Sequence, residues 1–202
     1  MLHYVTTNPG KLREARAYLG EEIEGYDYDY TEIQSPSLAE IAAHGAREAA
    51  REVGGPVIVD DAGLFVEGLD GFPGPYSSYV EHTLGIERVW RLGEALGNRH
   101  AEFRCVLAYC AGDSLGTDDA VGGDDAVDSD RADAESEELD VTCFTGVVPG
   151  TLVAPRGEGG FGYDPIFEHD GRTFAELTGE EKNAVSHRGR ALEEFAAWLD
   201  DR

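Results

Sequence analysis

Residues 57–79 decide the fold, and they read Val-Ile-Val-Asp-Asp-Ala-Gly-Leu-Phe-Val-Glu-Gly-Leu-Asp-Gly-Phe-Pro-Gly-Pro-Tyr-Ser-Ser-Tyr. The apolar, β-branched run 57–59 predicts a buried strand that ends in two adjacent carboxylates, Asp60 and Asp61. Successive side chains of a strand point to opposite faces. We therefore expect one aspartate to face a cleft and the other to turn toward backbone donors or a neighbouring strand. Gly63 predicts a turn, after which residues 64–66 resume a strand.

The end of this strand is a candidate metal site. Carboxylates at the C-terminal end of a buried strand, beside a glycine-rich loop, suit a hydrated Mg²⁺ ion. The same residues are also typical of a hairpin in which the two aspartates only cap a turn. Both interpretations stay open on this stretch alone.

The composition is strongly acidic. The chain of 202 residues has 41 Asp and Glu against 16 Lys and Arg, a formal charge of -25. This length allows one domain with a full core, and the charge argues against a nucleic-acid-binding surface. The acidic residues are spread along the chain, which indicates adaptation to a salt-rich cytoplasm, where screening lengths fall to ~3 Å near 1 M salt. Only two lysines occur, Lys11 and Lys182.

The cysteines, the apolar runs and the first residues of the chain together predict a cytoplasmic protein. Cys105, Cys110 and Cys143 lie in apolar segments without metal-ligand spacing, so we expect buried free thiols of a cytoplasmic protein. No apolar run approaches the ~20 residues that cross a bilayer. The first residues lead directly into a predicted strand, with no signal-peptide pattern.

The first 20 residues predict a strand, a tight loop and a helix. Residues 2–6 predict a first strand, and the loop Thr6-Thr7-Asn8-Pro9-Gly10-Lys11 precedes a helix with Leu12, Ala15 and Leu19 on one face. A helix N-terminus attracts phosphate, and an anionic ligand would account for Lys11 in the first turn. An ordinary capped helix explains the same residues.

A second strand and a long helix follow. Residues 26–33 alternate aromatic and acidic side chains, which predicts a strand with one buried face that ends near Glu32. Glu32 could supply a second metal ligand or simply be solvated. Ser37 predicts the cap of a helix that extends to about Val53, with Glu40 completing a capping box.

The middle of the chain predicts a helix and a hairpin. Residues 84–96 predict an amphipathic helix with Ile86, Val89, Trp90 and Leu96 inward. Residues 103–111 and 141–148 predict paired strands. Between them, residues 112–140 have 12 acidic residues against one Arg, which predicts a mobile insertion.

The last 50 residues contain a glycine-rich aromatic loop and a basic cluster. In residues 157–165, glycines surround Phe161 and Tyr163, so Phe161 could stack on a flat ligand or belong to the core. Lys182 lies one turn before His187 and Arg188, and these three donors could converge on one cleft or lie on a solvated surface. The final helix has Ala191, Leu192, Phe195, Ala196 and Leu199 as its apolar stripe.

Four blocks of this sequence together resemble the inosine triphosphate pyrophosphatase family. They are Thr6-x-Asn8-x-x-Lys11; residues 60–64 continuing to Gly71-x-Pro73-Gly74-x-Tyr76-Ser77; residues 159–165; and residues 181–188 (Glu-Lys-Asn-Ala-Val-Ser-His-Arg). The resemblance spans nearly the whole chain apart from the acidic insertion. It implies an α/β fold: a two-lobed protein with a long mixed β-sheet flanked by helices, a nucleotide cleft between the lobes, and usually a homodimer.

The same resemblance implies the reaction and the site. The reaction is hydrolysis of abnormal purine nucleoside triphosphates (ITP, dITP, XTP) to the monophosphate and pyrophosphate, with Mg²⁺ required. Asp61 corresponds to the metal-binding carboxylate and proton acceptor, and Glu32 is the expected partner ligand. The implied substrate-binding residues are Thr6, Asn8, Lys11, Ala62, Phe161, Gly162, Tyr163, Asp164, Lys182, His187 and Arg188.

The chain departs from the family pattern at the phosphate end. Ala62 replaces a frequent hydroxyl residue, Ser78 replaces a frequent basic residue, and the helix after Glu32 lacks a lysine for which Arg47 is a possible substitute. Two rival functions remain. One is a regulator that binds a nucleotide without hydrolysing it, and the other is a septum-formation-type pyrophosphatase acting on modified pyrimidine nucleotides. Pyrophosphate release from ITP, XTP and UTP separates them.

Overall fold

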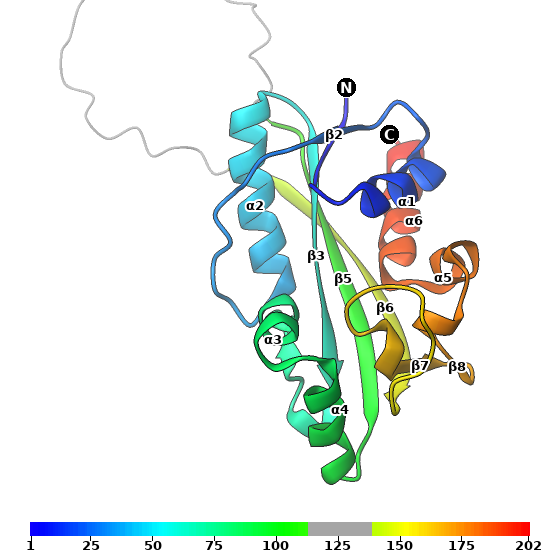
Figure 1. Ribbon diagram of the computed structural model, residues 1–202. Helices are drawn as coiled ribbons and strands as arrows, with labels where there is room; N and C mark the ends of the chain where they lie inside the picture. The colour runs from blue at the N-terminus through cyan, green and yellow to red at the C-terminus, as the bar shows by residue number, and fades with distance from the viewer. Residues whose placement is uncertain (113–138) are drawn as a thin grey trace, which may run out of the picture.

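One long mixed sheet organises the chain. The computed structural model describes residues 1–112 and 139–202. Within these residues, eight strands form one sheet in the order β2-β1-β3-β5-β6-β7-β8, and β4 pairs separately with β3 (Figure 1). The predicted α/β class with a long mixed sheet flanked by helices is confirmed, whereas the division into two lobes stays a prediction.

The elements follow one another along the chain with short connections. The strands are β1 (His3–Val5), β2 (Glu24–Tyr26), β3 (Val57–Val66), β4 (Pro73–Gly74), β5 (His100–Cys110), β6 (Val141–Leu152), β7 (Phe167–His169) and β8 (Arg172–Thr173). The helices are α1 (Pro9–Leu19), α2 (Leu38–Val53), α3 (Ser77–Leu84), α4 (Ile86–Ala95), α5 (Gly179–Val185) and α6 (His187–Asp200), with 3-10 turns at Glu67–Leu69, Asp164–Ile166 and Phe174–Glu176.

Strand β3 lies inside the sheet, between β1 and β5. Its first two residues, Val57 and Ile58, pair in parallel with β1, and its whole length pairs antiparallel with β5. The turn predicted at Gly63 is wrong, because β3 continues unbroken through this residue. The glycine serves a close approach instead: a Cβ atom at residue 63 would lie 2.1 Å from the carbonyl oxygen of Gly74 on β4.

The first predicted strand is confirmed as β1. The prediction of a strand over residues 26–33 is wrong. Strand β2 ends at Tyr26, where its carbonyl accepts the N–H of Thr6. Beyond that bond β1 turns into the loop before α1, so no partner strand remains. The following segment packs on α2 instead: Tyr28 and the N–H of Thr31 donate to Glu48.

Helices cover both faces of the sheet. The helix predicted from Ser37 to about Val53 is confirmed as α2, which packs on β3 and β5 through an alanine-rich stripe that includes Ala42, Ala46 and Ala49 (Figure 1). Its cap Ser37 accepts the N–H of Glu40. The second bond of the predicted capping box does not form, because the Glu40 side chain accepts from the Ser35 hydroxyl rather than from the Ser37 N–H. Helix α6 covers the opposite face together with α1.

The helix predicted over 84–96 is confirmed as α4 (Ile86–Ala95), and a further helix, α3 (Ser77–Leu84), precedes it. Gly85 adopts a φ of 82° and separates α3 from α4. The prediction is right for Val89, which is fully buried, and wrong for Leu96, which is 56% exposed. Because α4 ends at Ala95, Leu96 falls outside the helical stripe.

The hairpin and the last helix are confirmed. Strands β5 and β6 pair antiparallel from His100↔Thr151 to Cys110↔Val141. In α6, Ala191, Leu192 and Phe195 are fully buried, whereas Leu199 is exposed. The predicted mobile insertion, residues 112–140, lies largely outside the described residues.

Two further sequence predictions concern thiols and membranes. Cys105 and Cys110 are buried, but Cys143 is exposed, because it lines a shallow open pocket between β6 and α2. In the described ranges, no helix is long and apolar enough to cross a membrane.

The contact at Gly63 gives a stability prediction. In Gly63→Ala the new methyl group meets the backbone of Gly74, which cannot move without breaking the β3–β4 pairing. We expect a loss of about 2 kcal/mol or more in the free energy of unfolding, measured with guanidinium chloride. Gly55→Ala is the control, because a Cβ there meets nothing within 4 Å. Equal stability of the two variants would contradict this interpretation.

Candidate active site

Asp60 is the buried centre of a group of polar side chains. One carboxylate oxygen accepts from the Tyr4 hydroxyl at 2.6 Å and the Lys11 ammonium at 2.9 Å. The other accepts from Nε of Arg188 at 2.9 Å. Burial alone would raise the pKa of Asp60, but Lys11 and Arg188 offset burial and hold that pKa well below its usual range. Asp60 is therefore an anion held inside the protein.

Arg188 extends this group to a second buried carboxylate. Its Nη1 donates to Glu14 at 3.0 Å, and the side chains of both residues are 8% exposed. The Ser186 hydroxyl donates to the other oxygen of Glu14 at 2.7 Å. Because Glu14 lies on α1 and Ser186 caps α6, these bonds fix the two helices to each other.

Asp61 lies on the other face of β3, as the alternation along a strand predicted. Its Oδ1 accepts the N–H of Ala62 at 3.0 Å, whereas its buried Oδ2 has no hydrogen-bond partner among the described residues. Burial, followed by the charge of Asp60, raises the pKa of Asp61 to about 7. Such an oxygen is ready to accept a proton or to bind a cation.

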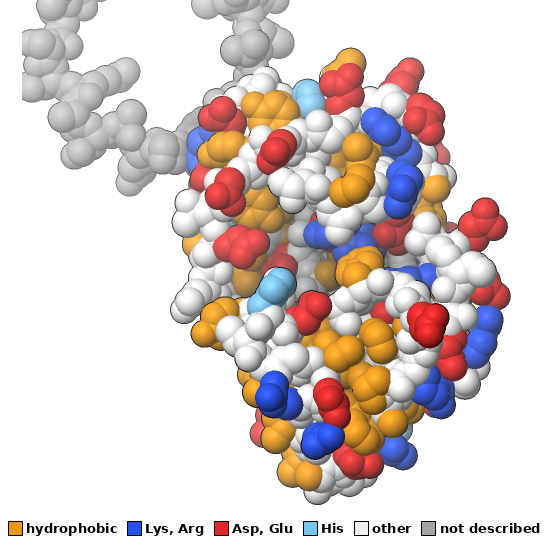
Figure 2. Space-filling model, in the orientation of Figure 1, with side chains coloured by type: hydrophobic (Ala, Val, Ile, Leu, Met, Phe, Trp, Pro, Cys, Tyr) orange, Lys and Arg blue, Asp and Glu red, His pale blue; other side chains and the backbone are white. Residues whose placement is uncertain are grey.

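Two neighbouring pockets meet at Glu32. Asp61 and Glu32 line a pocket of about 890 Å³ between β3, residues 33–34 and α3. Glu32 also lines a pocket of about 430 Å³ that contains Thr6, Lys11 and Asp60. Figure 2 shows a hollow near the middle of this face of the molecule, with basic side chains in its wall. The predicted pair of Glu32 and Asp61 is thus brought to one continuous surface.

The loop before α1 is built as a helix cap. The Asn8 side chain accepts the N–H groups of Gly10 and Lys11, and Thr6 Oγ1 accepts the N–H of Asn8. These bonds fix the first turn of α1 and place Lys11 beside Asp60. The Lys11 side chain remains 25% exposed, so its ammonium faces both the buried carboxylate and the pocket.

The glycine-rich loop holds the second lysine. Lys182 donates to Asp164 at 2.5 Å and lies 4.2 Å from the centre of the Phe161 ring. Asp164 also accepts the N–H of Phe161, and its side chain is 4% exposed. Phe161 itself is 60% exposed and available to stack, whereas Tyr163 is buried and donates to the carbonyl of Ser77. Gly162 adopts a φ of 60°, which lets the loop turn.

His187 is buried against Phe103. Its ring stacks on that of Phe103 with centroids 4.8 Å apart, and its buried Nδ1 has no partner among the described residues. Burial, then the charges of Arg188, Lys182 and Lys11, lower the pKa of His187 well below its usual value. Lys11 lines the smaller pocket at Glu32, whereas Lys182 lines neither of the two pockets that meet there.

Arg47, the possible substitute for a missing lysine, and Ser78, which stands where the family often has a basic residue, lie in different places. Arg47 donates from Nε to the carbonyl of Leu139 at 2.9 Å and lines a separate shallow pocket beside Cys143. Ser78 lines the Asp61 pocket. Of the two, only Ser78 therefore lines the pocket that contains Asp61.

Sequence reasoning missed Tyr4, Glu14 and Ser186. Tyr4 carries a strand signal, and Glu14 lies three residues after Lys11, hence on the same side of α1. That spacing could have suggested a shared role for Lys11 and Glu14. Nothing local in the sequence, however, connects either residue to Arg188.

Comparison with known proteins identifies the family. The model of the Ham1 family matches residues 2–124 and 129–198. The chain belongs to the Ham1 family. A dITP/XTP pyrophosphatase from Thermococcus kodakarensis is 46% identical over 206 residues, covering 99% of this chain and 97% of that protein. An inosine triphosphate pyrophosphatase from Aspergillus fumigatus is 38% identical over 202 residues, covering 99% and 95%.

Solved Ham1 structures share the fold. A HAM1 protein from Coxiella burnetii superposes with a TM-score of 0.80 at 31% identity, covering all of this chain and 98% of that one. The Ham1 protein of Staphylococcus aureus gives a TM-score of 0.78 at 27% identity and covers 99% and 98%. The resemblance drawn from the four sequence blocks is confirmed.

The Ham1 chain offers two carboxylates to a cation. Within the described ranges, no three His, Cys, Asp or Glu side chains are grouped as a complete metal site. Mg²⁺ is usually held by one or two carboxylates together with substrate phosphates and water. The unpartnered Oδ2 of Asp61, with Glu32 on the same pocket, fits this donor set.

The raised pKa of Asp61 predicts how stability changes with pH. The unfolded carboxyl ionises near pH 4, whereas the folded one keeps its proton to about pH 7, so folding stabilises the protonated form. This stabilisation is complete below pH 4 and is lost as the pH rises toward 7. We expect the unfolding free energy of Asp61→Asn, minus that of wild type, to grow by up to about 1.4 kcal/mol per pH unit between pH 4 and 7.

The measurement is guanidinium unfolding in EDTA, with Asp200→Asn as the control because Asp200 is exposed at the end of α6. Parallel pH profiles for wild type and Asp61→Asn would show that Asp61 ionises normally in the folded protein.

Proposed function

We propose that this chain is a Mg²⁺-dependent pyrophosphohydrolase that converts ITP, dITP and XTP into the nucleoside monophosphate and pyrophosphate. One observation carries the proposal: Asp61 lines a pocket together with Glu32, and its buried Oδ2 has no hydrogen-bond partner among the described residues. The relatives from Thermococcus kodakarensis, a dITP/XTP pyrophosphatase, and Aspergillus fumigatus, an inosine triphosphate pyrophosphatase, support the same reaction. The enzyme would remove deaminated purines from the nucleotide pool.

The triphosphate binds at the start of α1. The helix N-terminus presents backbone N–H groups and a positive dipole end. The Lys11 ammonium has three N–H groups, and the bond to Asp60 uses one of them. Asn8 and Thr6 keep this turn in its capped form, so the ligand meets donors that are already in place.

The base binds beside Phe161 and Lys182. Phe161 is exposed and offers a ring for stacking, and Asp164 holds the Lys182 ammonium over that ring. Hypoxanthine and xanthine present O6 as an acceptor, whereas adenine presents an amino donor. A pocket of cationic donors favours the acceptor by about 1–3 kcal/mol per unpaired group. Neutral His187 completes the wall, and Arg188 holds it from behind through Asp60 and Glu14.

Catalysis uses the twin aspartates differently. A bound Mg²⁺ would neutralise phosphate charge and orient the water that attacks. Asp61 and Glu32 would hold the cation, and Oδ2 of Asp61 would accept the proton of a water aligned with the α-phosphorus. Asp60 contacts no reacting atom and keeps Lys11 beside the phosphates.

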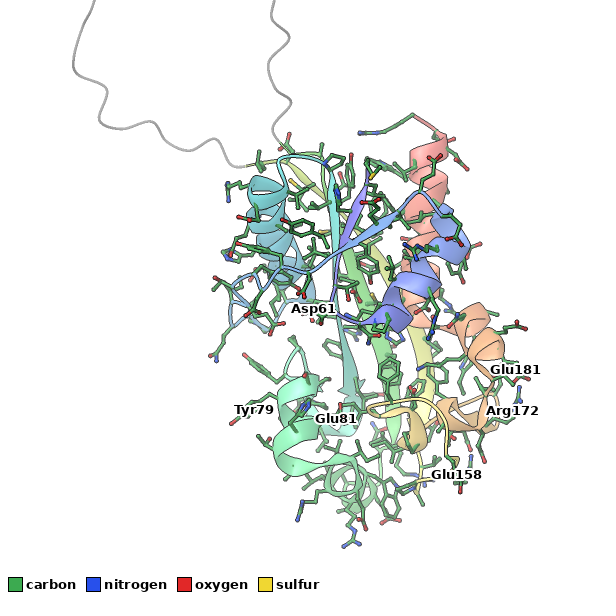
Figure 3. All side chains as sticks on the ribbon, turned by 45° about the horizontal axis from the view of Figure 1, so that its top comes forward. Asp61, Tyr79, Glu81, Glu158, Arg172 and Glu181 are labelled. Carbon is green, nitrogen blue, oxygen red and sulfur yellow. The ribbon has the colours of Figure 1, made fainter. Side chains whose placement is uncertain are left out.

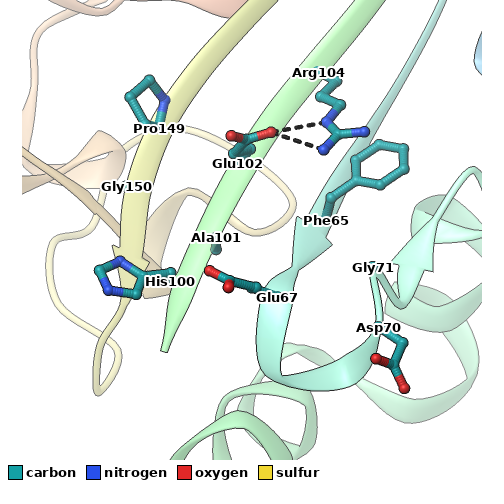
Figure 4. A pocket seen from close by; sticks show the side chains of 10 residues that line it. All are labelled: Phe65, Glu67, Asp70, Gly71, His100, Ala101, Glu102, Arg104, Pro149 and Gly150. Atoms are coloured by element: carbon teal, nitrogen blue, oxygen red, sulfur yellow. Dashed lines mark hydrogen bonds and ion pairs between the residues drawn. The ribbon is translucent and has the colours of Figure 1, made fainter. Parts of the chain in front are cut away.

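We further propose that the enzyme acts in a salt-rich cytoplasm and as a homodimer. Its charge of -25 supports a salt-rich cytoplasm, where self-repulsion is screened. An open sheet face supports a homodimer: Phe65, Glu102, Arg104, His100 and Pro149 line a pocket of about 860 Å³ (Figure 4), and none of its lining residues belongs to helices α1 to α6. Arg104 pairs with Glu102 and lies 4.4 Å from the centre of the Phe65 ring.

Replacing the carboxylate of Asp61 tests its proposed role in catalysis. We expect Asp61→Asn to reduce pyrophosphate release from ITP and Mg²⁺ by at least a thousandfold, because both the proton acceptor and a cation ligand are weakened. The affinity for ITP, measured by calorimetry in EDTA, should change less than threefold. Asp200→Asn should match wild type in both. Turnover of Asp61→Asn close to wild type would exclude the assigned role, and a wild type that binds ITP without hydrolysing it would favour the regulatory alternative.

Reversing the charge of Arg104 tests the proposed dimer. Sedimentation in molar KCl should show a dimer for wild type and a monomer for Arg104→Glu, which reverses a charge that lines the open sheet face. Arg91→Glu, on the exposed side of α4, should leave the dimer intact. A monomeric wild type would rule out the proposed dimer.

A further inference from the structure

Tyr30 lines the pocket at the start of α1 and takes no part in the proposed mechanism. This pocket has a volume of about 430 Å³, and Lys11 is its only basic residue among the described parts of the chain. The Lys11 ammonium donates to Asp60 at 2.9 Å, and its remaining N–H groups are fewer than the anionic oxygens of a triphosphate. A further hydrogen-bond donor in this pocket would therefore strengthen the binding of phosphate.

Helix α2 holds the ring of Tyr30 in place. The ring packs against the apolar cluster that α2 forms with β3 and β5. It lies directly on Gly45, because a Cβ atom at that residue would be 2.6 Å from Cε2 of Tyr30. Figure 3 shows Asp61 on β3, with the segment that joins β2 to α2 passing in front of that strand. The hydroxyl at the tip of the ring is thus held beside the site by contact with a helix.

The hydroxyl of Tyr30 lies near the carboxylates of the site. Burial and then the charges of three carboxylates raise the pKa of Tyr30, those of Asp60, Glu32 and Asp61. Despite these neighbours, the hydroxyl makes no hydrogen bond to any of the described residues. Even an ordinary tyrosine, with a pKa of about 10, keeps its proton at neutral pH. The hydroxyl is therefore a neutral donor whose hydrogen is available to a ligand in the pocket.

A neutral donor suits this pocket better than a second cation. Four acidic residues line it: Asp27, Asp29, Glu32 and Asp60. Opposite charges a few Å apart attract, so an additional ammonium here would pair with one of these carboxylates in place of phosphate. A hydroxyl forms no ion pair, and its bond to an anionic oxygen is stronger than a bond between neutral groups. Molar salt screens charges beyond ~3 Å but leaves such a direct bond in place.

We propose that Tyr30 is a further substrate-binding residue, whose hydroxyl donates a hydrogen bond to a phosphate oxygen of the bound triphosphate. The proposal rests on the proposed function, which places the triphosphate at the start of α1. It holds whichever phosphate lies nearest to Tyr30, because every phosphate group of the chain presents anionic oxygens. A bond made equally to the bound substrate and to the transition state lowers KM and leaves kcat unchanged.

Tyr30→Phe tests the contact, because it removes only the hydroxyl and keeps the ring on α2. We expect KM for ITP to rise about tenfold, the usual cost of losing a hydrogen bond to a charged group, while kcat stays within threefold of wild type. Tyr26→Phe, at the end of β2, is the matched control, because Tyr26 lines neither pocket that meets at Glu32, and its KM should stay within twofold.

Two kinetic results would overturn the proposal. One is a KM of Tyr30→Phe that equals that of wild type or of Tyr26→Phe. The other is a higher Mg²⁺ concentration for half-maximal rate without a rise in KM for ITP, because the hydroxyl would then act through Glu32 and not on phosphate.

Binding of inorganic tripolyphosphate separates this proposal from the proposed function, because it needs no turnover. In calorimetry with Mg²⁺ and molar KCl, Tyr30→Phe should bind tripolyphosphate about tenfold more weakly than wild type, with the same midpoint of guanidinium unfolding. Equal affinities, a lowered midpoint that accompanies the loss, or a wild type that does not bind tripolyphosphate would each overturn the contact. A wild type that binds tripolyphosphate without hydrolysing ITP would overturn the proposed function alone, and the affinity of Tyr30→Phe would still decide the role of the hydroxyl.

Discussion

The structure depends on the buried carboxylate of Asp60. It joins four elements, because β1 supplies Tyr4, α1 supplies Lys11, α6 supplies Arg188 and β3 carries the aspartate itself. A buried charge is tolerated only when it is paired and hydrogen-bonded, and leaving its partners without it would cost about 3–5 kcal/mol. The two ends of the chain are thus held together at the middle of the sheet, where the site is built.

The alternation of side chains between the two faces of a β-strand explains why the adjacent aspartates have such different surroundings and pKa values. Asp60 faces the cations on one side of β3, and its pKa is held low. Asp61 faces the pocket on the other side, where burial and its neighbour raise the pKa to about 7. One carboxylate organises the cationic side chains, and the other is left with an oxygen available for chemistry. A single strand therefore separates a structural role from a reactive one.

Local patterns in the sequence predicted a large part of this arrangement. The stripe of α2, the hairpin of β5 and β6 and the cap at Asn8 follow from short-range periodicity and capping, and the structure confirms them. The segment after Tyr26 was predicted wrongly, because whether it forms a strand depends on where β1 ends. The turn predicted at Gly63 is wrong, because the glycine is required by the close approach of Gly74 on β4, a contact that the local sequence does not show.

The candidate site shows the same limit. Sequence blocks indicated Lys11, Asp61, Lys182 and His187, because each stands in a short recognisable motif. Glu14 and Tyr4 lie in no such motif, and their role appears only when Arg188, more than 170 residues after Glu14, meets them in space. Burial of Arg188 is likewise a tertiary effect: a His-Arg pair at a helix start gives no sign that the arginine is enclosed by two carboxylates.

The central claim is that Asp61 directs water to the α-phosphorus, and the position of a heavy oxygen tests it most directly. Hydrolysis of ITP in H₂¹⁸O, followed by mass spectrometry, should place one ¹⁸O atom in IMP and none in pyrophosphate. Label in pyrophosphate would mean that water attacks the β-phosphorus, and release of IDP with labelled phosphate would mean attack at the γ-phosphorus. Either result would contradict the account.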